Sequence, residues 1–212
     1  MKALVLKSAS SLIATLLLTA CGGSSGGSDS TSDAGNTKTQ TNTPVVTTPE
    51  ASVDFASISD PALRYCVENT GITNVDQLQI LECTDSNITD LSGLEQFTAL
   101  TVLNLSNNLV TNLQPLAEIT SLSALTLSRN QVSSIAPLTN LENLQRLSLA
   151  YNQIATIDGV EQMAALNKLY IDNNHIQSLD PVNDTQLQFL IAHNNPAPLP
   201  SSMPSSMKSF RI

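Results

Sequence analysis

Histidine and cysteine are common catalytic and metal-binding residues, and this chain of 212 residues has few of them. It contains two histidines, His175 and His193, and three cysteines, Cys21, Cys66 and Cys83. Neither histidine has a nucleophile and an orienting carboxylate at a motif spacing, and there is no phosphate-binding loop or zinc-type Cys/His cluster. The sequence therefore predicts a protein that is not an enzyme and that uses no metal ion or cofactor.

Asparagine recurs at a nearly fixed interval along the second half of the chain. The members of this series are Asn108, Asn130, Asn152, Asn174 and Asn195, with Ser86 at the equivalent position upstream. An asparagine amide supplies both donors and an acceptor. We therefore predict a buried ladder of asparagines that satisfies backbone groups where the chain turns.

Apolar residues surround each asparagine in the repeated spacing LxxLxLxxNxI. This pattern occurs six times in full and once in part; its copies begin at Leu78, Leu100, Leu122, Leu144, Leu166, Leu187 and Met207. Within each copy, apolar and polar residues alternate, which is the period of a half-buried strand. We therefore expect Leu103 and Leu105 to point inward and Asn104 to point outward.

The apolar spacing changes to three after each strand, as at Leu113, Leu116 and Ile119. A strict period of three favours tight 3₁₀ or extended turns over an α-helix. One such repeat cannot bury its own apolar edge, but a stack of repeats forms a continuous core.

The repeated pattern over residues 78–212 resembles the leucine-rich-repeat family, and its 22-residue period is similar to that of bacterial internalins and of the repeat regulators of type-1 protein phosphatase. The resemblance implies an α/β solenoid: a right-handed coil with a parallel β-sheet on the concave face and short 3₁₀ or extended return legs. It says little about function, because this scaffold serves many partners.

Residues 52–77 are predicted to form a helical N-terminal cap on the first repeat. Asp60 and Pro61 are typical of a helix start, and Gly71 of a helix end. Cys66 falls on the inward face of this helix, and Cys83 takes an inward position on the first strand. In an oxidising compartment they should form a disulfide; the alternative is two buried free thiols.

The N-terminal 21 residues have the features of a signal peptide, with an apolar stretch too short to span a bilayer. Its end, Leu18-Thr19-Ala20-Cys21, resembles a bacterial lipobox. The resemblance implies that Cys21 carries a lipid in the cell envelope, and Gly22 favours the outer membrane if the organism is Gram-negative. Residues 22–51 are predicted to form a disordered Gly/Ser/Thr linker.

The formal net charge is −9. Removal of the signal peptide with Lys2 and Lys7 leaves seven basic and 18 acidic residues, a net charge of −11. This balance argues against nucleic-acid binding and against direct attraction to anionic lipid. We therefore expect contact with the membrane through the lipid anchor alone.

Outward strand positions are small or polar in the early repeats and larger in the later ones. We predict that the larger residues bind a partner: Arg146, Tyr151, Lys168, Tyr170, Asp172, Phe189, Ile191 and His193. Aromatic and arginine side chains are typical binding anchors. The alternative is that Phe189 and Ile191 belong to a terminal cap. The sequence favours a protein partner from a host or from the envelope, and the second candidate is a cell-wall or surface glycan.

The last partial repeat predicts a strand whose outer edge is unpaired. Lys208 and Arg211 would discourage pairing at this edge. Alternatively, the edge pairs with a second copy or with a peptide strand.

Overall fold

The computed structural model describes residues 51–212. The predicted signal peptide with its lipidation site Cys21, and all of the predicted linker except its last residue, lie outside these residues. In the described part, no helix has the length and apolar character needed to cross a membrane.

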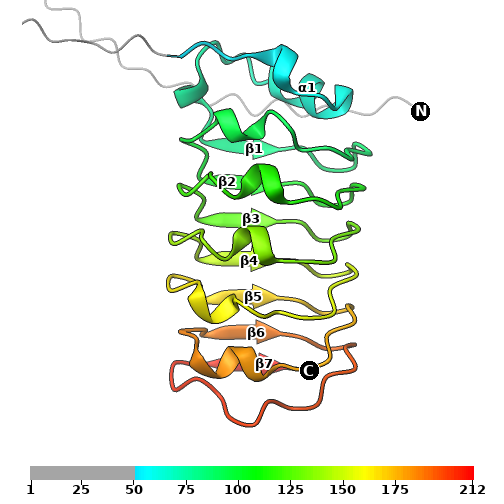
Figure 1. Ribbon diagram of the computed structural model, residues 1–212, viewed down its shortest axis with the longest axis vertical. Helices are drawn as coiled ribbons and strands as arrows, with labels where there is room; N and C mark the ends of the chain where they lie inside the picture. The colour runs from blue at the N-terminus through cyan, green and yellow to red at the C-terminus, as the bar shows by residue number, and fades with distance from the viewer. Residues whose placement is uncertain (1–50) are drawn as a thin grey trace, which may run out of the picture. The chain divides into compact units, whose positions relative to one another are not determined.

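Seven three-residue strands form one parallel sheet in chain order (Figure 1). They are β1 (Ile80–Glu82), β2 (Val102–Asn104), β3 (Ala124–Thr126), β4 (Arg146–Ser148), β5 (Lys168–Tyr170), β6 (Phe189–Ile191) and β7 (Ser209–Arg211). Ile80 pairs with Val102, Lys168 with Phe189, and Phe189 with Ser209. The predicted repeat and its shortening from 22 residues to 21 and then 20 are thus confirmed as strand register.

A short 3₁₀ turn occupies the return leg between successive strands up to β6 (Figure 1). These turns are η3 (Leu94–Gln96), η4 (Gln114–Leu116), η5 (Ala136–Leu138), η6 (Val160–Gln162) and η7 (Asp180–Asp184); η1 (Phe55–Ser57) and η2 (Val75–Gln77) precede β1. Apolar residues three apart line up on one side of such a turn. The predicted solenoid with 3₁₀ return legs is confirmed.

Inward leucines from every repeat form one continuous core. Leu103, Leu125, Leu147 and Leu169 are register partners and are almost completely buried. Each buried leucine stabilises the fold by roughly 1.5–3 kcal/mol. The stacked apolar columns therefore dominate the stability of the repeats.

The predicted asparagine ladder is present along the inner turn of the coil. The Asn130 amide donates to the carbonyls of Leu105 and Leu127, at 2.9 and 3.0 Å, and its oxygen accepts from the N–H of Val110 at 2.9 Å. The same contacts recur at Asn152, Asn174 and Asn195, although Asn195 is only partly buried. Each asparagine joins its own repeat to the one before it.

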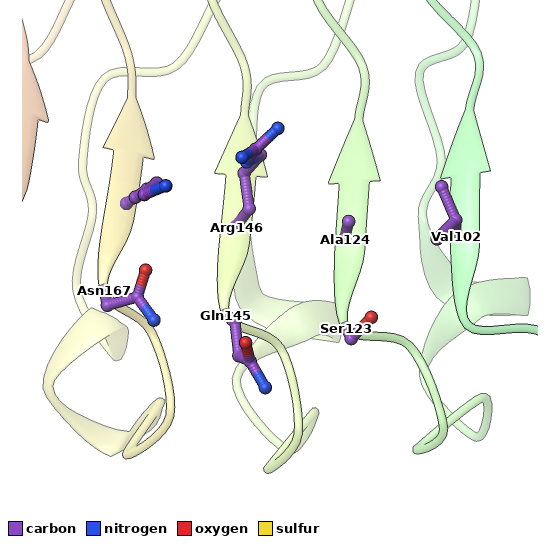
Figure 2. Close-up of a pocket in the computed structure, with 7 residues that line it drawn as sticks. Val102, Ser123, Ala124, Gln145, Arg146 and Asn167 are labelled. Atoms are coloured by element: carbon purple, nitrogen blue, oxygen red, sulfur yellow. The ribbon is translucent and has the colours of Figure 1, made fainter.

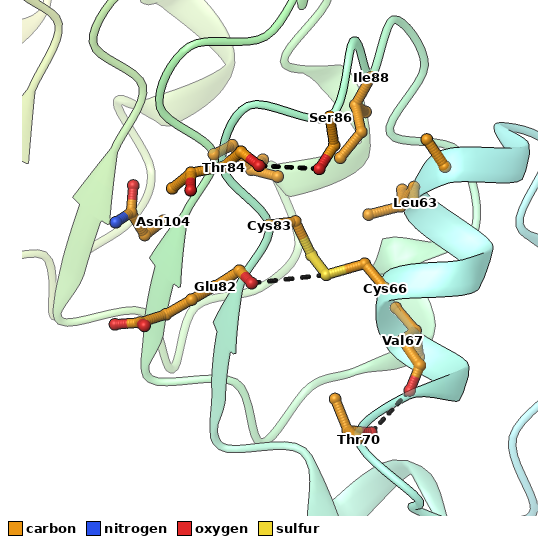
Figure 3. Close-up of a disulfide and its surroundings, with 12 residues drawn as sticks. Leu63, Cys66, Val67, Thr70, Glu82, Cys83, Thr84, Ser86, Ile88 and Asn104 are labelled. Atoms are coloured by element: carbon orange, nitrogen blue, oxygen red, sulfur yellow. Dashed lines mark hydrogen bonds between the residues drawn. A yellow bond between two sulfur atoms is a disulfide. The ribbon is translucent and has the colours of Figure 1, made fainter. Parts of the chain in front are cut away.

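Ser86 stands where the ladder begins and bonds differently. Its hydroxyl donates to the Thr84 carbonyl at 2.8 Å (Figure 3). Its N–H donates to the Asn108 side-chain oxygen at 3.1 Å. A serine suffices here because no earlier repeat supplies carbonyls to be bridged.

The residue before each ladder position adopts a left-handed backbone conformation that was not predicted from the sequence. The row comprises Asp85, Asn107, Arg129, Tyr151, Asn173 and Asn194, with φ between 55 and 59°. Asparagine and aspartate tolerate this conformation best. The bend points the row outward just beyond the carboxyl ends of the strands.

Helix α1 (Pro61–Glu68) forms the predicted cap and ends three residues before Gly71. One carboxylate oxygen of Asp60 accepts from the N–H groups of Ala62 and Leu63, at 2.9 and 3.1 Å. The other accepts from the N–H and hydroxyl of Thr89, at 2.9 and 3.1 Å. Asp60 therefore links the helix to the first return leg.

Burial raises the pKa of Asp60, but hydrogen bonds, above all those from Thr89 and Leu63, outweigh it and hold the pKa below its ordinary value. This carboxylate is only 7% exposed. The cap is thus held by a charged acceptor that receives donors from two elements.

The Cys66–Cys83 disulfide joins α1 to the residue that follows β1, as the sequence predicts (Figure 3). The two Cα atoms are 6.0 Å apart. Leu63 and Val67, on the same side of the helix, are fully buried. The alternative of two free thiols does not hold in the structure.

The end of the last repeat departs from the expected pattern. Phe210 points inward from β7 and is half-buried, but Ile212 is 47% exposed. The β-strand ends at Arg211, so the alternation that would bury Ile212 does not extend to it.

Candidate binding face

The outward strand side chains, together with the polar residue just before each strand, form one surface, which we call the strand face. Inward residues are buried in the core, so a partner on this side of the coil meets the outward strand side chains and the turns at their edges. The early and the later repeats differ in how many polar groups of this face are hydrogen-bonded within the protein.

In the early repeats, outward polar side chains hydrogen-bond one another. The Asn104 side-chain oxygen accepts from the Ser106 hydroxyl at 2.7 Å, and the Ser128 and Ser148 hydroxyls are 2.8 Å apart. The Ser106, Ser128 and Ser148 hydroxyls and the Asn104 oxygen are thus used within the fold.

In the later repeats, the predicted residues form a contiguous apolar and cationic cluster. Tyr170 on β5 is the register partner of Ile191 on β6, and Lys168 is the partner of Phe189. The Lys168 ammonium lies 5.5 Å from the centre of the Phe189 ring. All four are only partly buried, so Phe189 and Ile191 remain accessible on the strand face.

Tyr151 does not join this cluster on the strands. It lies in the left-handed row after β4, and its side chain is 45% exposed. The guanidinium carbon of Arg129, from the same row one repeat earlier, is 4.3 Å from the Tyr151 ring centre. Tyr151 was predicted at an outward strand position, and Arg129 was not predicted as a site residue. Both lie in the left-handed turn that follows a strand, and this turn was not predicted from the sequence.

Asp172 and His193 lie beyond the ends of β5 and β6. The His193 Nε2 atom is 3.8 Å from an Asp172 carboxylate oxygen, a contact that becomes an ion pair when the imidazole is protonated. The Asn173 amide donates to the same oxygen at 2.7 Å. Asp172 is therefore already engaged within the fold.

A hollow of about 360 Å³ crosses the middle of the strand face (Figure 2). Its lining residues are Val102, Ser123, Ala124, Gln145, Arg146, Asn167 and Lys168. Ala124 is small, and its strand lies between those of Val102 and Arg146, which leaves the space open. Figure 2 shows Ser123, Gln145 and Asn167 at the starts of their strands, below the position from which Arg146 projects.

Arg146 and Lys168 were predicted from the sequence as binding residues, but the side-chain amides beside them were not. Their signal is present in the sequence: the position before every strand is polar. The series is Gln79, Thr101, Ser123, Gln145, Asn167, Gln188 and Lys208.

The described residues contain no group of three or more His, Cys, Asp or Glu side chains that could hold a metal ion. His175 is exposed beside the asparagine ladder, away from the hollow. The arrangement offers surfaces for contact, with aromatic, cationic and amide groups side by side.

Comparison with known proteins matches the family model described as leucine-rich repeats (2 copies) to residues 67–118, 120–162 and 142–184. The chain belongs to the leucine-rich-repeat family. The matches span more than half of it, from the cap helix to the return leg before β6.

Solved structures support the same architecture. An internalin (InlF) from Listeria monocytogenes aligns with a TM-score of 0.65 and 22% identity over 72% of this chain and 48% of that one. The functional domain of InlJ from the same species, described as including a cysteine ladder, aligns with a TM-score of 0.60 and 26% identity. The alignment covers 69% of this chain and 34% of that one. A Leptospira interrogans leucine-rich-repeat protein aligns with a TM-score of 0.57 and 26% identity, over 65% of this chain and 37% of that one.

The chain thus spans between about a third and a half of these structures. No curated protein matches the sequence significantly.

Proposed function

We propose that this chain is a non-catalytic protein-binding module of the bacterial cell envelope, which holds a host or envelope protein on the strand face of its later repeats. The observation that carries this proposal is the cluster of Lys168, Tyr170, Phe189 and Ile191 on adjacent, register-paired strands. Partly exposed aromatic rings beside a cation supply contact area at little entropic cost, as in many protein-binding surfaces.

The lipobox-like sequence ending at Cys21 supports attachment to a membrane by a lipid, with the repeats held away from the bilayer. Metabolic labelling with palmitate tests this part of the proposal. The label should enter the wild-type chain and be absent from a Cys21→Ala variant; label in the variant would contradict it.

The binding role is tested by capturing partners from envelope and host-cell extracts on the immobilised full chain. A Tyr170→Ala/Phe189→Ala variant should lose the captured protein, because both rings contribute contact area and neither is a core residue. Its melting temperature should stay close to that of the wild type.

Tyr65→Ala is the matched control, because Tyr65 is an exposed aromatic residue on α1, outside the strand face. It should leave capture unchanged. Equal capture by all three chains would refute the proposed surface, as would a loss of thermal stability in the double variant equal to that of a core substitution.

A glycan is the alternative ligand, because Tyr170 and Phe189 offer ring faces on which sugars stack. A glycan array probed with the same three chains separates the two functions. Binding to the array that depends on Tyr170 and Phe189, with no protein captured, would replace the proposed function with glycan recognition.

A further inference from the structure

Arg146 and Lys168 have no ion-pair partner among residues 51–212, although the protein is acidic. The chain has 18 acidic residues against nine basic ones. Among residues 51–212, however, the one contact between oppositely chargeable side chains is that between His193 and Asp172, so no carboxylate lies within ion-pair distance of Arg146 or Lys168.

The two cations are register partners on β4 and β5. Neighbouring strands are about 4.8 Å apart, and like charges directly opposite each other on a sheet destabilise it. An anion between the two side chains would remove this repulsion. A bound anion would therefore favour this arrangement of like charges on neighbouring strands.

The surroundings of the pair fit a carboxylate. Gln145 and Asn167 line the same hollow, and the side-chain amide of neither makes a hydrogen bond within the described residues. Their N–H donors are free to bind a second oxygen, and charge-assisted bonds from Arg146 and Lys168 to an anion are strong. Val102 and Ala124, on β2 and β3, add apolar lining to the hollow.

We propose that the hollow formed by Ser123, Gln145, Arg146, Asn167 and Lys168 binds carboxylate side chains of an acidic segment in the protein partner. This inference rests on the proposed function, because it specifies the chemistry of the partner's bound segment. No carboxylate lines the hollow, and the one acidic residue among the outward strand residues is Glu82 on β1, outside the strands β2 to β5 that form the hollow.

Fluorescence anisotropy with a fluorescein-labelled decaglutamate peptide tests the proposal on the full chain at low salt. The peptide should bind, and an Arg146→Gln/Lys168→Gln variant should weaken binding by about tenfold or more, since each lost charge-assisted contact is substantial. Added salt should weaken binding through screening.

Lys208→Gln/Arg211→Gln is the matched control, because it removes the same charge from the region of β7. It should change the affinity less than about twofold, if binding reflects the hollow and not net charge. In the wild type, decaglutamate should also shift the Arg146 Nε–H resonance.

Equal affinities for all three chains, equal losses in both double variants, or equally tight binding of decaglutamine would overturn the proposal. Tighter binding of oligoglucuronate would assign the hollow to an acidic sugar and overturn it too. Partner capture that depends on Tyr170 and Phe189 but not on Arg146 and Lys168 would remove this inference alone. Decaglutamate binding without any captured protein would remove only the proposed function.

Discussion

Single polar residues hold this coil together at points where its leucines cannot. Asn130 satisfies two carbonyls and one N–H group inside the turn, in contact with two repeats. No water reaches these groups easily, because the asparagine itself is buried. The ladder therefore contributes specificity of stacking as well as stability.

Asn130→Ala should lower the free energy of unfolding by about 1–3 kcal/mol for each buried group left unsatisfied. Urea unfolding followed by circular dichroism measures this. Asn167→Ala is the control, since the Asn167 side chain makes no hydrogen bond in the described structure and its loss should have little effect. An unchanged midpoint for Asn130→Ala would contradict the structural role of the ladder.

Asp60 makes the cap sensitive to acid. Its pKa is lowered in the folded chain, so the folded state favours the carboxylate. The resulting stabilisation is fully present above the unfolded pKa of about 3.9 and is lost as the pH falls through the lower, folded value.

An Asp60→Asn variant should therefore be less stable than the wild type at pH 7, and the difference should shrink as the pH drops below about 4. Unfolding free energies of the two chains at a series of pH values measure this. A difference in unfolding free energy that stays constant down to pH 2 would show that the charge of Asp60 does not contribute to stability.

At the scale of elements, two glycines show how closely the return legs pack. Gly93 and Gly159 precede η3 and η6 with nearly identical φ values of 95 and 94°. An added Cβ at Gly93 would lie 2.7 Å from the backbone Cα of Ile58, whereas at Gly159 it would meet the Thr139 methyl group at 2.5 Å. A backbone cannot move aside as a side chain can.

Both glycine-to-alanine substitutions should cost roughly 1–3 kcal/mol for the left-handed backbone. Gly93→Ala should cost a further 1–3 kcal/mol or so, because the cap segment must shift. Thermal unfolding compares them. A Gly159→Ala chain as unstable as Gly93→Ala would mean that contact with Ile58 does not constrain the cap.

The elements were largely predictable from sequence because each depends on apolar spacing. Apolar residues two apart predicted the strands, and apolar residues three apart predicted the 3₁₀ turns of the return legs. Asp60 and Pro61 predicted the start of α1. The end of α1 and the exposure of Ile212 were not predictable in the same way, since they depend on where local hydrogen bonding stops. The left-handed row was missed because Arg129 and Tyr151 interrupt its asparagine and aspartate signal.

The candidate site was predictable only in part, for a physical reason. Outward alternation identifies Lys168, Tyr170 and Phe189 as members of one face. The hollow, however, depends on differences in side-chain size between strands, such as Ala124 beside Arg146, which a single repeat does not reveal.

For the molecule as a whole, the early repeats serve mainly as a scaffold, and the later repeats carry the proposed binding residues. Ser106 and Ser128 pair with neighbouring side chains, while the Arg146 and Lys168 side chains and the Gln145 and Asn167 side-chain amides have no hydrogen-bond or ion-pair partner among residues 51–212. A one-dimensional stack allows this division, because each repeat contacts mainly its neighbours and outward residues vary freely. Binding specificity then resides in a few adjacent repeats on a common core.

Site-specific photo-crosslinking tests this central claim most directly. A full chain with p-benzoylphenylalanine in place of Tyr170 should crosslink to the captured partner, and one with it in place of Tyr65 should not. Efficient crosslinking from position 65 with none from position 170 would contradict the account and move the binding surface to the cap.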